Sequence, residues 1–164
     1  MRQAEQQKKI RNQAGRSLKK AEAVLEAETN RRMKNEFLER FMLCELACKK
    51  IITGYNEHKH RAVVERDIKL QLPTIQAALK YAGYPRYQGR VEQVFGSGDK
   101  RGSKTCKKLR DGIVHSMSAG DIREVASRYR ELMEDMDSFL ALIRTNSGGK
   151  RGKKAEKRRM KNAA

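Results

Sequence analysis

The most regularly patterned part of the chain is FLERFMLCELACKKII, residues 37–52. Its large apolar residues recur three or four positions apart, as they do on one face of an α-helix. The apolar face is wide, which is typical of a helix that packs into a core. These residues predict a long buried helix, and we expect it to end near Gly54 because glycine readily adopts the left-handed conformation that closes helices.

The helical pattern continues in both directions from these residues. Toward the N-terminus, the apolar stripe before Met33 is thin and heavily charged, which predicts a projecting helical extension over residues 1–34. Downstream, the apolar positions from Val63 to Ala82 predict a second helical stretch. Pro73 lies inside this stretch, so either the helix kinks there or a new helix starts there.

Two more helices are expected in the C-terminal half. The first covers residues 104–117, and the second follows a capping box in which the Ser118 hydroxyl and the Asp121 carboxylate satisfy free backbone amides. This last helix carries a full apolar stripe as far as Ile143. Between Gly83 and the first of these helices we expect only loops and a short apolar patch. Because the connections are short and no alternating run predicts a strand, we expect an all-α, mostly antiparallel bundle of four or five helices.

Composition limits the class of protein. The 164 residues amount to about one domain, and 38 Lys and Arg against 20 Asp and Glu leave a net charge of +18. We expect no membrane span, because no apolar run is long enough. The polar N-terminus predicts no secretory signal. Three cysteines without a framework spacing indicate a reducing compartment, so we expect a cytoplasmic protein.

The positive charge is concentrated at the two ends of the chain. Residues 1–34 hold 10 basic and 4 acidic residues, residues 35–144 hold 20 and 15, and residues 145–164 hold 8 and 1. We therefore predict a globular domain over 35–145 and a flexible basic tail over 146–164, because the tail has too little apolar content to fold. Such a tail attracts polyanions by counterion release. Alternatively, it is a solubility tail or an expression remnant.

The residues best suited to chemistry lie in LRDGIVHS, residues 109–116. Asp111 and His115 are four positions apart and share a helix face, so the carboxylate can accept a hydrogen bond from the imidazole and orient it. Arg110 precedes His115 by five positions, and its long side chain must reach round the helix. Gly112 in mid-helix predicts the close approach of another backbone.

This pattern of Arg, a polar residue and then His near a helix end, followed by a capped amphipathic helix, resembles the HEPN family (higher eukaryotes and prokaryotes nucleotide-binding). The resemblance covers residues 35–145 as a helical bundle and is specific over LRDGIVHS and the helix that follows. Asp111 stands where the family most often has Asn. Many members are metal-independent ribonucleases, often toxins or antiphage effectors, that act as dimers with the motif at the subunit interface.

The resemblance implies a role for each residue of the motif. His115 would serve as general base or acid in RNA cleavage, Arg110 would hold the scissile phosphate, and Asp111 would orient His115. A homodimer would supply the second proton-transfer group. No metal or other cofactor is expected. Four basic residues on the same helix or in the segment that leads into it would contact the RNA backbone: Arg101, Lys104, Lys107 and Lys108.

Three alternatives remain open from the sequence. In the first, Arg110 and Asp111 are ordinary surface residues and His115 only caps its helix. In the second, the chain is a non-catalytic basic module that binds nucleic acid through its charged ends. In the third, the chain is an interaction protein neutralised by an acidic partner, such as an antitoxin or another regulatory protein.

Overall fold

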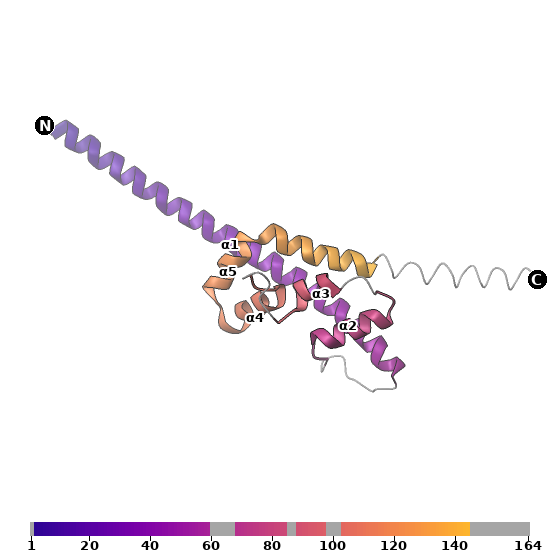
Figure 1. The fold of residues 1–164 in the computed structure, drawn as a ribbon. Coiled ribbons are helices and arrows are strands. Elements are labelled where there is room, and N and C mark those ends of the chain that lie inside the picture. Colours follow the sequence, from indigo (N-terminus) through magenta and orange to yellow (C-terminus); the bar gives the residue numbers. More distant parts are fainter. Residues whose placement is uncertain (1, 60–67, 85–87, 98–102, 145–164) are drawn as a thin grey trace, which may run out of the picture.

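The described part of the chain consists of helices joined by short connecting segments. The computed structural model describes residues 2–59, 68–84, 88–97 and 103–144. Its labelled helices are α1 (Arg2–His58), α2 (Leu72–Tyr81), α3 (Gln88–Phe95), α4 (Cys106–Ser116) and α5 (Ala119–Ser127) (Figure 1). A last helix, without a label in the figure, covers residues 129–144. No strand occurs in these ranges, which confirms the all-α prediction. The predicted basic tail over 146–164 lies outside the described residues.

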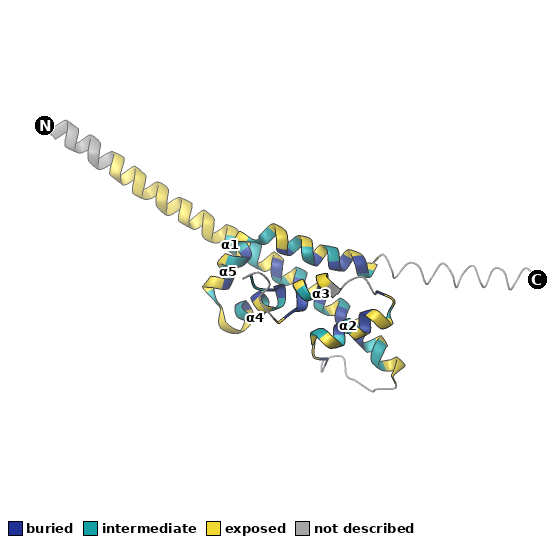
Figure 2. Cartoon of the chain, viewed as in Figure 1, coloured by how far each residue is buried: buried dark blue, intermediate teal, exposed yellow. Residues whose placement is uncertain are grey.

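Helix α1 is a single helix of 57 residues that belongs only partly to the folded body. Its N-terminal half projects away from the other helices (Figure 1), and every side chain from residue 11 to 29 is exposed (Figure 2). The expected end near Gly54 was wrong, because α1 continues to His58. An exposed helical glycine costs only about 1 kcal/mol, and the contacts of Ile52 and Tyr55 with the core hold the helix together on both sides.

The core forms around the second half of α1. Five apolar residues of the predicted face are buried: Phe37, Phe41, Cys44, Cys48 and Ile52. Ala47 and Ile51, predicted on the same face, are only partly buried against the core. The Phe95 ring of α3 packs against Phe41 at a centroid distance of 5.5 Å and against Phe139 of the last helix at 5.6 Å. Helices α2, α4 and α5 all contact α1. The aromatic chain therefore joins α1, α3 and the last helix into one core.

Of the two possibilities for Pro73, a kink within a helix or the start of a new helix, the structure shows the second. Helix α2 begins at Leu72, with Pro73 in its first turn, so a new helix starts there. Proline fits this position because the first amides of a helix have no intrahelical acceptor. Gly83 follows the helix with a φ of +88°. The short apolar patch expected downstream is part of a helix, α3. None of the described helices is long and apolar enough to cross a membrane.

The predicted last helix, continuous from Ser118 to Ile143, is broken at Arg128. The break separates α5 from the last helix, and Arg128 has a φ of −109° and a ψ of 15°. Its guanidinium donates to the Lys104 carbonyl at 2.9 Å and to Glu124 Oε1 at 2.8 Å. The contact with Lys104 is long-range, which explains why the local pattern did not predict the break.

We expect Phe95→Ala to lower the free energy of unfolding by roughly 3–5 kcal/mol, because the substitution leaves a cavity between two other rings. Urea denaturation followed by circular dichroism measures this change. Val24→Ala, at a position that is 57% exposed on the projecting half of α1, serves as the control and should change stability by no more than about 0.5 kcal/mol. Equal effects of the two substitutions would contradict the aromatic core.

Candidate active site

Helix α4 carries the motif, and both of its ends are defined by local contacts. Thr105 is the N-cap: its hydroxyl accepts a hydrogen bond from the Lys108 N–H at 3.4 Å and donates to the buried carbonyl of Gly96 at 2.6 Å. At the other end, Met117 adopts the left-handed conformation with a φ of 48°. Its N–H donates to the Ile113 carbonyl at 3.1 Å. The motif therefore lies on a helix with defined ends, with His115 in its last turn.

The two sides of α4 have different environments. Cys106, Leu109 and Ile113 are buried in the core. The polar side faces an open depression with a volume of about 440 Å³, which we call the α4 depression. Its lining consists of Lys107, Arg110, Asp111 and His115 of α4, Glu45 and Lys49 of α1, and residues 68–71 before α2. The three residues expected to carry chemistry therefore share one surface feature.

Arg110 is held in place by three neighbours. Its guanidinium forms an ion pair with Glu45 of α1 and another with Asp111 at 2.8 Å. It also lies over the Phe41 ring, with its central carbon 5.2 Å from the ring centroid. The side chain is 22% exposed. A guanidinium with two carboxylate partners and an aromatic ring beneath it has a fixed orientation and still presents some of its donors to solvent.

Asp111 does not accept a hydrogen bond from His115. Its oxygens accept hydrogen bonds from the other side: Oδ1 pairs with Arg110 at 2.8 Å and Oδ2 with Lys107 at 2.6 Å. The His115 side chain is exposed, and within the described ranges it forms no hydrogen bond. The expected hydrogen bond from the imidazole to Asp111 is therefore absent. Two cations compete for the carboxylate, and both offer stronger, charge-assisted hydrogen bonds than a neutral imidazole.

The four basic residues expected to track RNA are not equivalent. Lys107 lines the α4 depression. Lys108 is exposed on the same helix but is not part of this lining. The Lys104 ammonium pairs with the buried Asp121 carboxylate, and the Lys104 N–H donates to Glu124 Oε1 at 3.1 Å. Lys104 therefore joins the segment before α4 to α5, a role that the sequence did not indicate. Arg101 lies outside the described residues.

Gly112 has a packing role that the sequence only partly predicted. A Cβ at this position would lie 1.8 Å from Oδ2 of Asp121 and 2.9 Å from its Cγ. The missing side chain thus makes room for the Asp121 carboxylate, whereas we expected another backbone. Asp121 is 4% exposed, and its pairing with Lys104 compensates for the cost of burying a charge.

Of the two hydrogen bonds predicted for the capping box at the start of α5, one is present and one is absent. The Ser118 hydroxyl accepts a hydrogen bond from the Asp121 N–H at 3.2 Å, as predicted. The Asp121 carboxylate does not turn back to the Ser118 amide, which donates instead to the Gly112 carbonyl at 3.3 Å. The carboxylate is engaged by Lys104. The same aspartate therefore fixes the angle between α4 and α5.

The three cysteines lie in the core and not in the α4 depression. All three are buried, and burial raises the pKa of the Cys44 and Cys106 thiols to about 12. Burial also raises the pKa of Cys48. Among the residues that the structure describes, no three His, Cys, Asp or Glu side chains come together as a metal site.

Sequence reasoning missed the residues that α1 and the segment before α2 contribute. Glu45 and Lys49 are four positions apart on the polar edge of α1, a common pattern on exposed helix faces. Lys69 belongs to a connecting segment with no motif. No local signal distinguishes these residues from other surface charges, because they reach the depression only through the packing of α1 against α4.

Comparison with known proteins identifies no relative: no protein-family model, curated protein or solved structure matches this chain. Function therefore has to be inferred from the chemistry of the α4 depression itself.

We expect Gly112→Ala to lower the free energy of unfolding by roughly 1–3 kcal/mol, because the added methyl group collides with a buried carboxylate. The matched control is Gly54→Ala, in a helical position with no atom within 4 Å of the new Cβ. There the reduced backbone freedom of the unfolded chain should raise stability by about 0.5–1 kcal/mol. Thermal and urea unfolding measure both changes, and effects of the same sign would contradict the tight contact.

Proposed function

We propose that this chain is a metal-independent endoribonuclease and that the α4 depression is its active site. The observation that carries the proposal is the gathering of Arg110 and His115, five positions apart in the sequence, on one open surface with additional cations. The resemblance of LRDGIVHS to the HEPN motif points to the same chemistry. The proposal includes RNA as the substrate and a toxin or antiphage role restrained by an acidic partner.

The charge of the depression favours a phosphate group. Its lining holds four permanent cations against two carboxylates: Lys49, Lys69, Lys107 and Arg110 against Glu45 and Asp111. Arginine has five N–H donors in a planar fork, and the two ion pairs of Arg110 do not use all of them. Arg110 can therefore bind a phosphate oxygen while Glu45 keeps the guanidinium oriented. The same contact would stabilise the additional negative charge of the transition state.

His115 supplies the proton transfer in this mechanism. Its exposed imidazole can take the proton from a ribose 2′-hydroxyl, or give one to the leaving oxygen. Cleavage needs both steps, and each chain has one histidine in the depression. A second copy of the chain would provide the other, as expected for a homodimeric enzyme of this type.

Asp111 has a different role in the proposed mechanism from the one the sequence indicated. Because its oxygens pair with Arg110 and Lys107, it positions the two cations rather than the imidazole. Its effect on catalysis would therefore be exerted through phosphate binding.

A second candidate function is non-catalytic binding of nucleic acid. The observation that favours it is the engagement of Arg110 by Glu45 and Asp111, which partly neutralises the charge that an enzyme would direct at the phosphate. In this case the α4 depression holds the RNA backbone without cutting it. The two candidates differ in what they do to RNA and not in whether they bind it.

Under the first proposal, His115→Ala should reduce cleavage of a single-stranded RNA oligonucleotide at least ~100-fold and leave its binding unchanged. The control is His58→Ala, another exposed histidine outside the depression, which should cleave at the wild-type rate. EDTA should not inhibit, and an oligonucleotide with 2′-deoxyribose should bind without being cut. Cleavage that survives His115→Ala would exclude this site, and binding without cleavage by the wild type would favour the second candidate.

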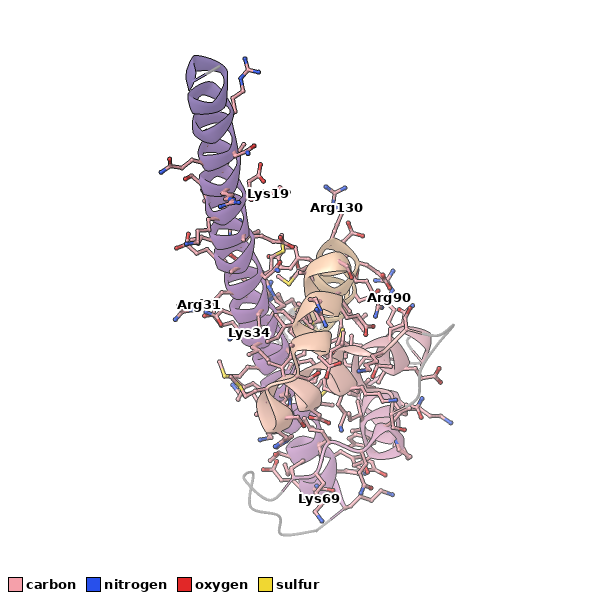
Figure 3. The ribbon with its side chains drawn as sticks, turned by 90° about the vertical axis from the view of Figure 1, so that its left-hand side faces the viewer. Lys19, Arg31, Lys34, Lys69, Arg90 and Arg130 are labelled. Carbon is pink, nitrogen blue, oxygen red and sulfur yellow. The ribbon has the colours of Figure 1, made fainter. Side chains whose placement is uncertain are left out.

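Both candidates predict that the lysines of the depression neutralise phosphates. Replacing Lys49 and Lys69 together by Gln should weaken RNA binding and lower the slope of log affinity against log salt by about 1 for each phosphate that is no longer neutralised. Replacing Lys19 and Lys34, which lie along α1 away from Lys69 (Figure 3), provides a control that removes the same amount of charge. An identical effect of both double variants would show that only net charge matters.

A further inference from the structure

The projecting part of α1 is exposed along its length, and it approaches another helix at its end nearest the body, where Ala27 lines a hollow with Ala119 and Ile122 of α5. We call residues 11–29 the arm. All of its side chains are exposed, including large apolar ones: Leu18 at 61%, Val24 at 57% and Leu25 at 63%. Most of the stability of helices in proteins comes from the packing of an apolar face, which the arm lacks, and Gly15 lowers its helix stability by about 1 kcal/mol. A partner that covers the apolar residues would stabilise the arm.

Four exposed apolar residues of the arm, with a charged residue at each end, lie on one regular stripe, and Val24 lies beside it. Alternating steps of three and four residues connect six positions, which we call the arm stripe: Arg11, Ala14, Leu18, Ala21, Leu25 and Glu28. This is the spacing of the contact seam of a coiled coil. At about 100° per residue, the stripe lies roughly 150° round α1 from the core face that begins at Phe37. The arm stripe therefore points away from the body and is free to meet another molecule.

We propose that the arm stripe binds the arm of a second copy of this chain in antiparallel orientation. The two-fold axis lies between residues 19 and 20. In this register Ala14 faces Leu25 of the second copy, and Leu18 faces its Ala21. Each apolar layer thus pairs a large side chain with a small one, which lets two helices pack closely without gaps or collisions.

Charge selects the same orientation. In the antiparallel register Arg11 of one copy faces Glu28 of the other, so an ion pair closes each end of the contact. A parallel pair would set Arg11 against Arg11 and Glu28 against Glu28, and it would leave gaps between facing alanines. In a two-fold contact each layer occurs twice, so the antiparallel arrangement gains two ion pairs where the parallel one has two repulsive layers.

This contact is distinct from one that would bring two active sites together. With a rise of about 1.5 Å per residue, the antiparallel arms hold the two Phe37 residues about 50 Å apart. The two α4 depressions are then separate, so the arm dimer neither requires the proposed ribonuclease activity nor supplies a second His115 to it. It would instead present two basic bodies at opposite ends of one assembly.

Sedimentation of the nucleic-acid-free full chain over a range of concentrations tests the contact. The wild type should pass from monomer to dimer, and Leu18→Ala combined with Leu25→Ala should weaken dimerisation at least ~30-fold, because the two substitutions remove a large side chain from each of the four apolar layers. Alanine has the highest helix propensity, so the arm remains helical. Leu43→Ala, an exposed leucine of α1 outside the arm, is the matched control and should dimerise like the wild type.

Charge reversal tests the orientation. Arg11→Glu alone, or Glu28→Arg alone, should weaken the dimer roughly tenfold by placing like charges opposite each other. The two reversals together should restore wild-type association. Within one helix these residues are too far apart to touch, so restoration can arise only between chains. Unchanged thermal unfolding of the body in every variant confirms that only the arm is affected.

Three results would overturn this proposal. The first is a wild type that remains a monomer at all concentrations. The second is a dimer that survives the two leucine substitutions. The third is a double charge reversal that fails to restore association. If the chain is monomeric and the leucine substitutions instead weaken RNA binding, the arm is a surface for nucleic acid and not for a second copy.

Discussion

The arrangement of the C-terminal half depends on one contact, the Asp121 carboxylate set against Gly112 and paired with Lys104. A carboxylate is buried in a protein only where a cation or strong donors meet it. Here the space comes from a missing side chain on α4 and the cation from the segment that leads into α4. The contact therefore connects three consecutive parts of the chain, and it sets the direction in which the polar side of α4 faces.

That direction matters because α4 is both a core helix and the wall of a depression. Leu109 and Ile113 fix it to the core, so its polar residues must face outward toward α1 and the segment before α2. Arg110 then meets Glu45 and the Phe41 ring. The same packing that stabilises the body thus holds the guanidinium in place, while His115, in the last turn of the helix, remains exposed.

Local pattern predicted the amphipathic helices, but it missed the short helix α3 and the places where helices continue or break. The apolar spacing of residues 37–52 identified the side of α1 that faces the core, and the Ser118 cap was found at the start of α5. The continuation through Gly54 and the break at Arg128 were missed. Both involve contacts with distant parts of the chain: core contacts on either side of the glycine, and the carbonyl of Lys104, in the segment before α4, for the guanidinium.

The order of residues alone establishes the helical class, the charged projecting half of α1 and the placement of Arg110, Asp111 and His115 on one helix, because helical periodicity is a local property. Only the tertiary structure establishes which groups these residues face. The partners of Asp111 proved to be Arg110 and Lys107, Lys104 became the counterion of a buried aspartate, and Glu45, Lys49 and Lys69 joined the depression. Contacts between residues distant in the chain follow from how helices cross, and no local spacing encodes a crossing angle.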